Sequence, residues 1–217
     1  MPSSEHNGEA DDRAQRQRQQ RRREIIEAAK GVFAERGYHG ASISDIIGAA
    51  KIARGTFYLY FTSKHHVFDS ILEEALHELR SRIARIDVSE DAPPPQVQLR
   101  ANLVRVMEFA VGDPHFSRLL LRARGQDREV TERVESFYAH VGDLIAASLE
   151  YGIEIGLVRH CDTGLVASAL LGAVRGIIDH LLTREPALDI ESVVDELLRF
   201  ALGGVISSGE RWLAGAS

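Results

Sequence analysis

The polar side chains best suited to binding another molecule are concentrated near the N-terminus, in the run SISDIIGAAKIARGTFYLYFTSK from Ser42 to Lys64. Ser42 and Asp45 have the Ser-x-x-Asp spacing of a capping box, in which a hydroxyl and a carboxylate pair with N–H groups that a helix start leaves unpaired. A helix is therefore expected to begin at Ile43. A second short helix is expected over residues 54–60. Two short helices joined by a tight turn predict a helix-turn-helix, whose second helix enters the major groove of DNA.

This run resembles the DNA-binding signature of the TetR (tetracycline repressor) family of one-component transcriptional regulators. The resemblance covers residues 21–70, and beyond them only the chain length and the helical layout agree. It is carried by Gly37-Tyr38, Ser42, Asp45-Ile46, Gly55-Thr56, Tyr58, Tyr60-Phe61 and Ser63-Lys64.

Two residues of the run depart from the family pattern. Lys51 stands where the turn usually has a left-handed Gly, which costs about 1–2 kcal/mol if the turn keeps that shape. The turn is therefore either strained or differently shaped. Ala53 stands where the second helix often has a Ser N-cap, which forgoes about 1 kcal/mol.

The resemblance implies a role in DNA binding for eight residues. Arginine reads guanine through O6 and N7, so Arg54 is predicted to discriminate between sequences. The residues expected to face the major groove are Arg54, Gly55, Thr56 and Tyr58, with Ser44 supplementing them from the first motif helix. Those expected to hold phosphates are Ser42, Tyr60 and Lys64.

Charge is divided unevenly along the chain. The net charge is −6, yet residues 13–64 hold 11 basic and 4 acidic side chains, whereas residues 65–217 hold 15 basic and 24 acidic ones. Polyanion binding is therefore expected at one end only. Residues 1–20 lack apolar periodicity and are expected to be a disordered basic arm. The arm is either a solubilising tail or a phosphate contact, and its arginines, with those just after it, are Arg13, Arg16, Arg18, Arg21, Arg22 and Arg23.

The rest of the chain predicts an all-α protein. An N-terminal three-helix helix-turn-helix domain is expected over residues 21–66, and a C-terminal helical ligand-binding and dimerisation domain over residues 67–217. Apolar residues recur at helical spacing, and Asp87 to Pro95 reads as a loop. Besides the two motif helices, helices are expected at about 24–36, 64–86, 96–111, 114–124, 127–155, 163–184 and 190–208.

The last two predicted helices are apolar on more than one face, which exceeds the stripe that one core needs. Gly172 and Gly176, four residues apart, would let another helix approach closely. One interpretation is a buried central helix of the monomer. The preferred one, as in the resembled family, is a homodimer whose interface includes Gly172, Gly176, Leu197 and Ala201.

No motif indicates catalysis, a cofactor or a metal site. The nine histidines and single cysteine form no HExxH or CxxC pattern, and no Gly-rich phosphate loop or GxSxG elbow occurs. The N-terminus is polar and no apolar run approaches the length of a membrane span, so a cytoplasmic protein with no membrane partner is expected.

The resemblance instead implies a repressor that binds double-stranded operator DNA and is released by a small, largely apolar effector. Arg175 and Asp179 are expected to form an ion pair in an apolar helix. The alternative is a helical small-molecule-binding or scaffold protein with an inactive head, which Lys51 and Ala53 favour. Candidate effector contacts are polar residues placed among apolar ones: His115, Arg118, Arg122, Tyr138, His140 and Arg175.

Overall fold

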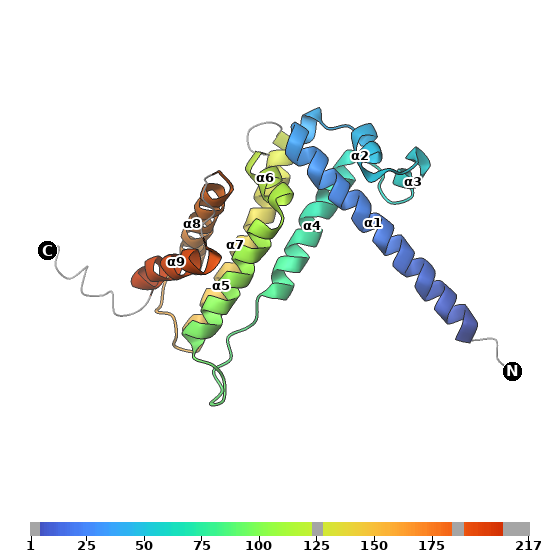
Figure 1. The fold of residues 1–217 in the computed structure, drawn as a ribbon. Helices are drawn as coiled ribbons and strands as arrows, with labels where there is room; N and C mark the ends of the chain where they lie inside the picture. Colours follow the sequence, from blue (N-terminus) through green and yellow to red (C-terminus); the bar gives the residue numbers. More distant parts are fainter. Residues whose placement is uncertain (1–4, 123–127, 184–188, 206–217) are drawn as a thin grey trace.

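The computed structural model describes residues 5–122, 128–183 and 189–205, and the regular secondary structure in these ranges is α-helical (Figure 1). The all-α prediction is therefore confirmed, with N-terminal helix-turn-helix elements followed by a helical body. The last predicted helix reached residue 208, and residues 206–208 lie outside the described ranges. The helices are α1 (Glu5–Gly40), α2 (Ile43–Ala50), α3 (Arg54–Tyr58), α4 (Lys64–Arg82), α5 (Pro95–Gly112), α6 (Pro114–Arg122), α7 (Arg128–Glu154), α8 (Thr163–Thr183) and α9 (Ile190–Val205).

Helix α1 corrects the prediction of a disordered arm, because it begins at Glu5 and projects well beyond the rest of the molecule (Figure 1). Side chains 12–20 are all exposed, so packing does not hold this part. Apart from Asp12, residues 12–20 are Ala, Gln and Arg, which are strong helix formers, and the packed half of α1 supplies the costly nucleus. The Arg16 Nε donates to the Asp12 carbonyl (3.1 Å). Helical conformation lapses at Gly37 (φ 69°, ψ 166°), where the sequence predicted a stop.

The three helices of the head pack around aromatic side chains. Phe33, Phe57 and Phe61 are fully buried, and Phe33 meets Phe68 of α4 edge-on at 5.9 Å. The same buried cluster continues through α4 into α6 and α7, as far as Phe137. The domain boundary predicted between residues 66 and 67 stays a prediction, since it marks no break in the core.

The turn between α2 and α3 adopts the strained form. Lys51 lies in the left-handed region (φ 53°, ψ 45°), and its N–H donates to the Gly48 carbonyl at 3.2 Å, which ends α2. Ala53 begins α3 with no side-chain cap. The packing of α2 and α3 in the core of the head therefore maintains a turn that the local residue preferences oppose.

Helix α4 ends at Arg82, four residues before the predicted end. The buried Asn102 side chain of α5 explains the early stop, because it accepts from the Ala84 N–H (3.0 Å) and donates to the Ala84 carbonyl (2.7 Å). These bonds replace the helical partners of Ala84. Gln98 binds the loop that follows, at Asp87 and Pro93. In Figure 1, α4, α5 and α7 run side by side, and α8 and α9 lie on the side away from the projecting end of α1.

Candidate DNA-binding surface and effector cavity

The start of α3 presents the side chains predicted to read bases. Arg54, Gly55 and Tyr58 are exposed, as is Ser44 on α2, whereas Thr56 is half-buried. The Arg54 guanidinium lies 5.9 Å from the centre of the Tyr58 ring. The structure thus exposes four of the five predicted groove-facing residues, and their contacts to DNA stay a prediction.

Ser42 builds the start of α2. Its Oγ accepts from the Asp45 N–H (3.1 Å) and donates to the Asp45 carboxylate (2.6 Å), which also accepts from the Ser42 N–H (2.9 Å). The predicted capping box is therefore formed. The Ser42 hydroxyl and backbone N–H, with the Arg36 guanidinium, lower the pKa of the Asp45 carboxyl. A phosphate bound here would meet a hydroxyl that already has partners.

Lys64 has intramolecular partners that the sequence did not reveal. Its Nζ donates to the Tyr38 carbonyl (2.7 Å) and the Ala41 carbonyl (2.8 Å), and lies 4.3 Å from the centre of the Tyr38 ring. The ammonium thereby joins the end of α1 to the start of α4. Tyr60 is half-buried and packs against the core of the head. The phosphate roles of both residues stay predictions, and Lys64 has a structural role in addition.

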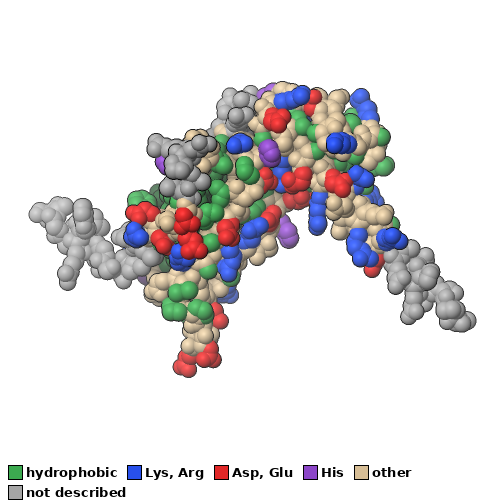
Figure 2. Space-filling view, viewed as in Figure 1, with side chains coloured by type: hydrophobic (Ala, Val, Ile, Leu, Met, Phe, Trp, Pro, Cys, Tyr) green, Lys and Arg blue, Asp and Glu red, His purple; other side chains and the backbone are tan. Residues whose placement is uncertain are grey.

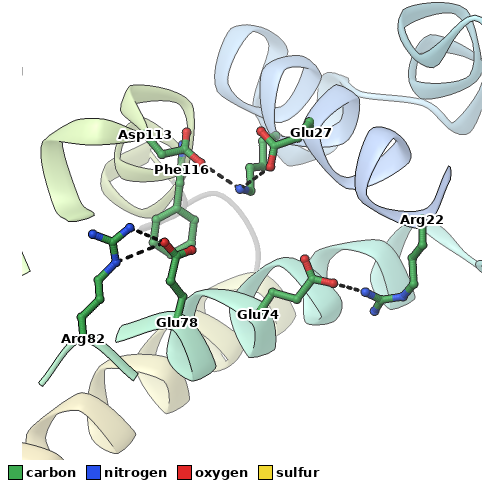
Figure 3. Close-up of polar contacts among 8 residues, drawn as sticks. Arg22, Glu27, Glu74, Glu78, Arg82, Asp113 and Phe116 are labelled. Carbon is green, nitrogen blue, oxygen red and sulfur yellow. Dashed lines mark hydrogen bonds and ion pairs between the residues drawn. The ribbon is translucent and has the colours of Figure 1, made fainter. Parts of the chain in front are cut away.

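The projecting half of α1 carries the basic arm. Arg13, Arg16 and Arg18 are exposed along it, and Figure 2 shows basic side chains there, whereas acidic side chains gather over α9 and the loop after α4. Arg22 differs, because it pairs with Glu74 of α4 (Figure 3) and lies over the Phe61 ring at 5.4 Å. Arg22 thus fixes the base of the arm, while the outer arginines face solvent.

Sequence reasoning missed Leu59, which follows α3 and is 71% exposed. The signal was available, since Phe57 and Phe61 are the buried pair and residue 59 lies midway between them on the opposite side. An exposed leucine beside Tyr58 adds an apolar side chain to the surface predicted to face DNA, of the kind that packs on thymine methyl groups.

A second site is an apolar cavity, partly open to solvent, between α5, α6, α7 and α8, with Leu79 of α4 also in its wall. Two of the predicted effector residues line it, Tyr138 and Arg175. His115, Arg118 and His140 do not, and they are exposed. Their role in effector binding stays a prediction that this cavity does not support, because helical spacing does not show which way a polar side chain points. Arg122 has a side chain outside the described part of the structure.

Arg175 also departs from its predicted pairing. Among the described residues it forms no ion pair with Asp179, which is exposed. Its guanidinium instead lies 3.8 Å from the centre of the Tyr138 ring on α7. A cation over an aromatic face is stabilised by the ring quadrupole. The contact turns Arg175 inward from α8 to the cavity wall.

One ion pair connects the head to the cavity-lining helix α6. Lys30 of α1 donates to Asp113 (2.8 Å) and Glu27 (2.7 Å), and Asp113 accepts the Phe116 N–H at the start of α6 (3.0 Å; Figure 3). Burial opposes charge on Lys30, but its hydrogen bonds to Asp113 and Glu27 outweigh burial and raise its pKa. Burial likewise opposes the Asp113 charge, and the bonds from Lys30 and Phe116 lower its pKa. Both groups are held charged.

The predicted dimer face is partly available. Gly172 and Gly176 are exposed on α8, and a Cβ added to either would meet nothing within 4 Å. Leu165 on the same helix is 69% exposed. Ala201 is half-buried, but Leu197 is only 4% exposed, so it is a core residue of the chain rather than an interface contact. Among the described helices, α8 is long and apolar enough to cross a membrane, a test that soluble core helices also pass.

These features together define an all-α helix-turn-helix protein with a separate apolar cavity in its body. The family model for "Bacterial regulatory proteins, tetR family" matches residues 25–71. The chain is 23% identical over 184 residues to the "Fatty acid metabolism regulator protein" of Bacillus subtilis, covering 84% of this chain and 94% of the relative.

Solved structures agree over most of the chain. The fatty acid degradation regulator FadR from Bacillus halodurans has a TM-score of 0.72 at 25% identity, covering 85% of this chain and 95% of that one. FadR from Bacillus subtilis in complex with stearoyl-CoA has a TM-score of 0.71 at 22% identity, covering 84% and 98%. The chain belongs to the TetR family of transcriptional regulators. It is a DNA-binding transcriptional regulator.

Proposed function

We propose that the protein is a homodimeric repressor that binds a palindromic operator through α3 and is released when a small, largely apolar effector occupies the cavity. The observation that carries the proposal is the position of α6. It supplies Phe116, Ser117 and Leu120 to the cavity wall, and its first turn is bonded through Asp113 to Lys30 of the head. A molecule that displaces α6 therefore acts on the head directly.

The chemistry of the cavity wall supports a largely apolar effector. Most of the wall consists of aliphatic and aromatic side chains, among them Phe109, Phe116 and Phe137. Burying apolar ligand surface contributes about 25 cal/mol per Å². The stearoyl-CoA complex of the Bacillus subtilis neighbour is consistent with an effector that has a long apolar part.

The exposed apolar residues of α8 support the homodimer. This helix has the composition of a buried one, yet Leu165, Gly172 and Gly176 face outward. Contiguous exposed apolar surface marks an interaction site. A second copy, packed on the two glycines by a two-fold axis, would cover it and place two heads on the two halves of a palindrome.

The relatives that the chain matches are transcriptional regulators, and we infer that the chain acts by binding rather than by catalysis, in the cytoplasm. The alternative is a helical binding or scaffold protein with an inactive head. The left-handed Lys51 and uncapped Ala53 favour it, and the exposed Arg54 and Tyr58 oppose it.

A fluorescence-anisotropy titration of the full-length protein against DNA upstream of its own gene tests the proposal. We expect two protomers to bind one palindromic site, and an apolar compound identified by thermal-shift screening to release that DNA. Tight binding of compounds without any saturable, sequence-dependent DNA binding would contradict the proposal and support the inactive-head alternative.

A further inference from the structure

We propose that the effector carries a carboxylate and that Arg175 binds it, so that the cavity selects apolar acids over neutral molecules of the same shape. This inference deepens the proposed function and rests on it. Its starting point is that Arg175 is the one charged residue among those lining the cavity in the described part of the chain.

The other polar side chains of the cavity wall, Ser117 and Tyr138, carry no charge. Ser117 is buried, and its Oγ donates to the Ala110 carbonyl within the α5–α6 corner. Tyr138 presents its ring to Arg175. The guanidinium is therefore the group that would decide which polar function of a ligand is accepted.

Within the described part of the chain, the cationic side chain of Arg175 has no anionic partner. Among the described residues it forms neither an ion pair nor a hydrogen bond, and Asp179, one turn along α8, is exposed to solvent. The contact to the face of the Tyr138 ring fixes the cation without using any of its five N–H donors. Those donors are arranged as a planar fork that matches a carboxylate bidentately. A ligand carboxylate would supply the missing partner.

The charge of the surrounding body favours a singly charged ligand. Residues 65–217 hold 24 acidic and 15 basic side chains, so the long-range field of the body repels anions. An anion is then retained only by local contact, and a single guanidinium compensates one negative charge. A carboxylate on an apolar skeleton carries one negative charge, which Arg175 can compensate by direct contact. A phosphate dianion would leave one charge uncompensated in an apolar cavity.

The test measures binding of matched acid and alcohol pairs to the full-length protein by calorimetry, without DNA. Octanoate and octanol form the chain pair, and naphthoate and naphthalenemethanol form the ring pair. We compare the wild type with Arg175→Gln and Arg175→Lys. Arg118→Gln is the control, because it removes the same charge from an exposed position of α6 that does not line the cavity.

We expect at least one acid to bind the wild type more tightly than its alcohol. Arg175→Gln should weaken that acid by about 10- to 100-fold, the range for charge-assisted hydrogen bonds, and leave the alcohol within about twofold. Arg175→Lys should retain part of the preference and Arg118→Gln all of it. Retained alcohol binding also shows that the Gln variant is folded.

The inference is overturned if neither acid binds the wild type, if each alcohol binds as tightly as its acid, or if Arg175→Gln keeps its acid affinity. An alcohol that binds equally well and still releases operator DNA overturns this inference alone. Acid binding through Arg175 with no effect on operator DNA would instead leave the site intact and contradict the proposed function.

Discussion

Replacing Lys30 with Met removes the charge that joins the head to α6 and keeps most of the side-chain volume. The Lys30 side chain is 16% exposed and that of Asp113 is 27% exposed, so the pair lies between a surface pair, worth about 0–1 kcal/mol, and a buried pair, whose breakage costs about 3–5 kcal/mol. Asp113 would keep its bond from the Phe116 N–H. We therefore expect Lys30→Met to lower the free energy of unfolding by about 1–2 kcal/mol.

Urea unfolding at neutral pH measures this loss, and a double-mutant cycle with Asp113→Asn isolates the pair. Asn keeps a cap at the start of α6 and removes the charge. The control is Glu27→Gln, since the Glu27 side chain is 65% exposed and its pair with Lys30 should contribute under about 0.5 kcal/mol. A coupling energy near zero between Lys30 and Asp113 would refute the reasoning.

The pH dependence of that coupling has a definite sign. The pKa of Asp113 is lowered from 3.8, so its contribution is present above that ordinary value and is lost as pH falls through the lower folded value. The pKa of Lys30 is raised from 10.5, so its contribution is present below 10.5 and is lost as pH rises through the higher folded value. The coupling should therefore be constant at neutral pH and weaken in acid. A coupling that grows as the pH is lowered below 3.8 would contradict the ion pair.

Four further changes test separate parts of the structure. Arg54→Ala should cost about 1–3 kcal/mol on the cognate site and relax one base position per half-site, and equal losses on random DNA would contradict a reading role. Gly176→Leu should give monomers with an unchanged fold, because a Cβ there meets nothing within 4 Å among the described residues; light scattering checks this, and a dimeric variant would place the interface elsewhere. Gly152→Ala should destabilise by about 1–3 kcal/mol, because its Cβ would lie 2.6 Å from Val158 Cγ2; Gly172→Ala, in open space, is the control in thermal unfolding. Deleting residues 1–18 should reduce the salt slope of operator binding by roughly 2–5, since the arginines of the two arms neutralise phosphates, and an unchanged slope would make the arm a passive tail.

The sequence predicted those helices whose capping residues and apolar spacing match the face that the structure buries. The Ser42 and Asp45 box placed the start of α2, and apart from the start of α1, the predicted bounds of the other described helices agree with the structure to within a few residues. The projecting half of α1 escaped this reasoning for a physical reason. Periodicity reports which side chains are buried, and a helix that is exposed on every face has none to report, although its propensity is high.

The sequence also did not predict which distant residues some side chains contact. Lys64 binds carbonyls at Tyr38 and Ala41, more than 20 residues earlier in the chain, and Arg175 meets a ring on another helix rather than the carboxylate one turn away. Both outcomes depend on how distant helices meet, which single-sequence spacing does not encode. The cavity raises the same difficulty, because two of the five proposed effector residues with described side chains line it.

The proposed control of the head from the cavity rests on the continuity of the core. Phe57 and Phe61 of the head, the buried face of α4, and Phe116 and Leu120 of α6 belong to one continuous cluster, and α6 is also a cavity wall. A ligand shifts a conformational equilibrium only by its difference in affinity for the two states. An effector that fits better when α6 has moved must therefore also repack the side chains that α6 shares with α1 and α4. Close-packed interiors rearrange in discrete steps rather than deforming smoothly, so occupancy of the cavity is expected to select between two positions of the head.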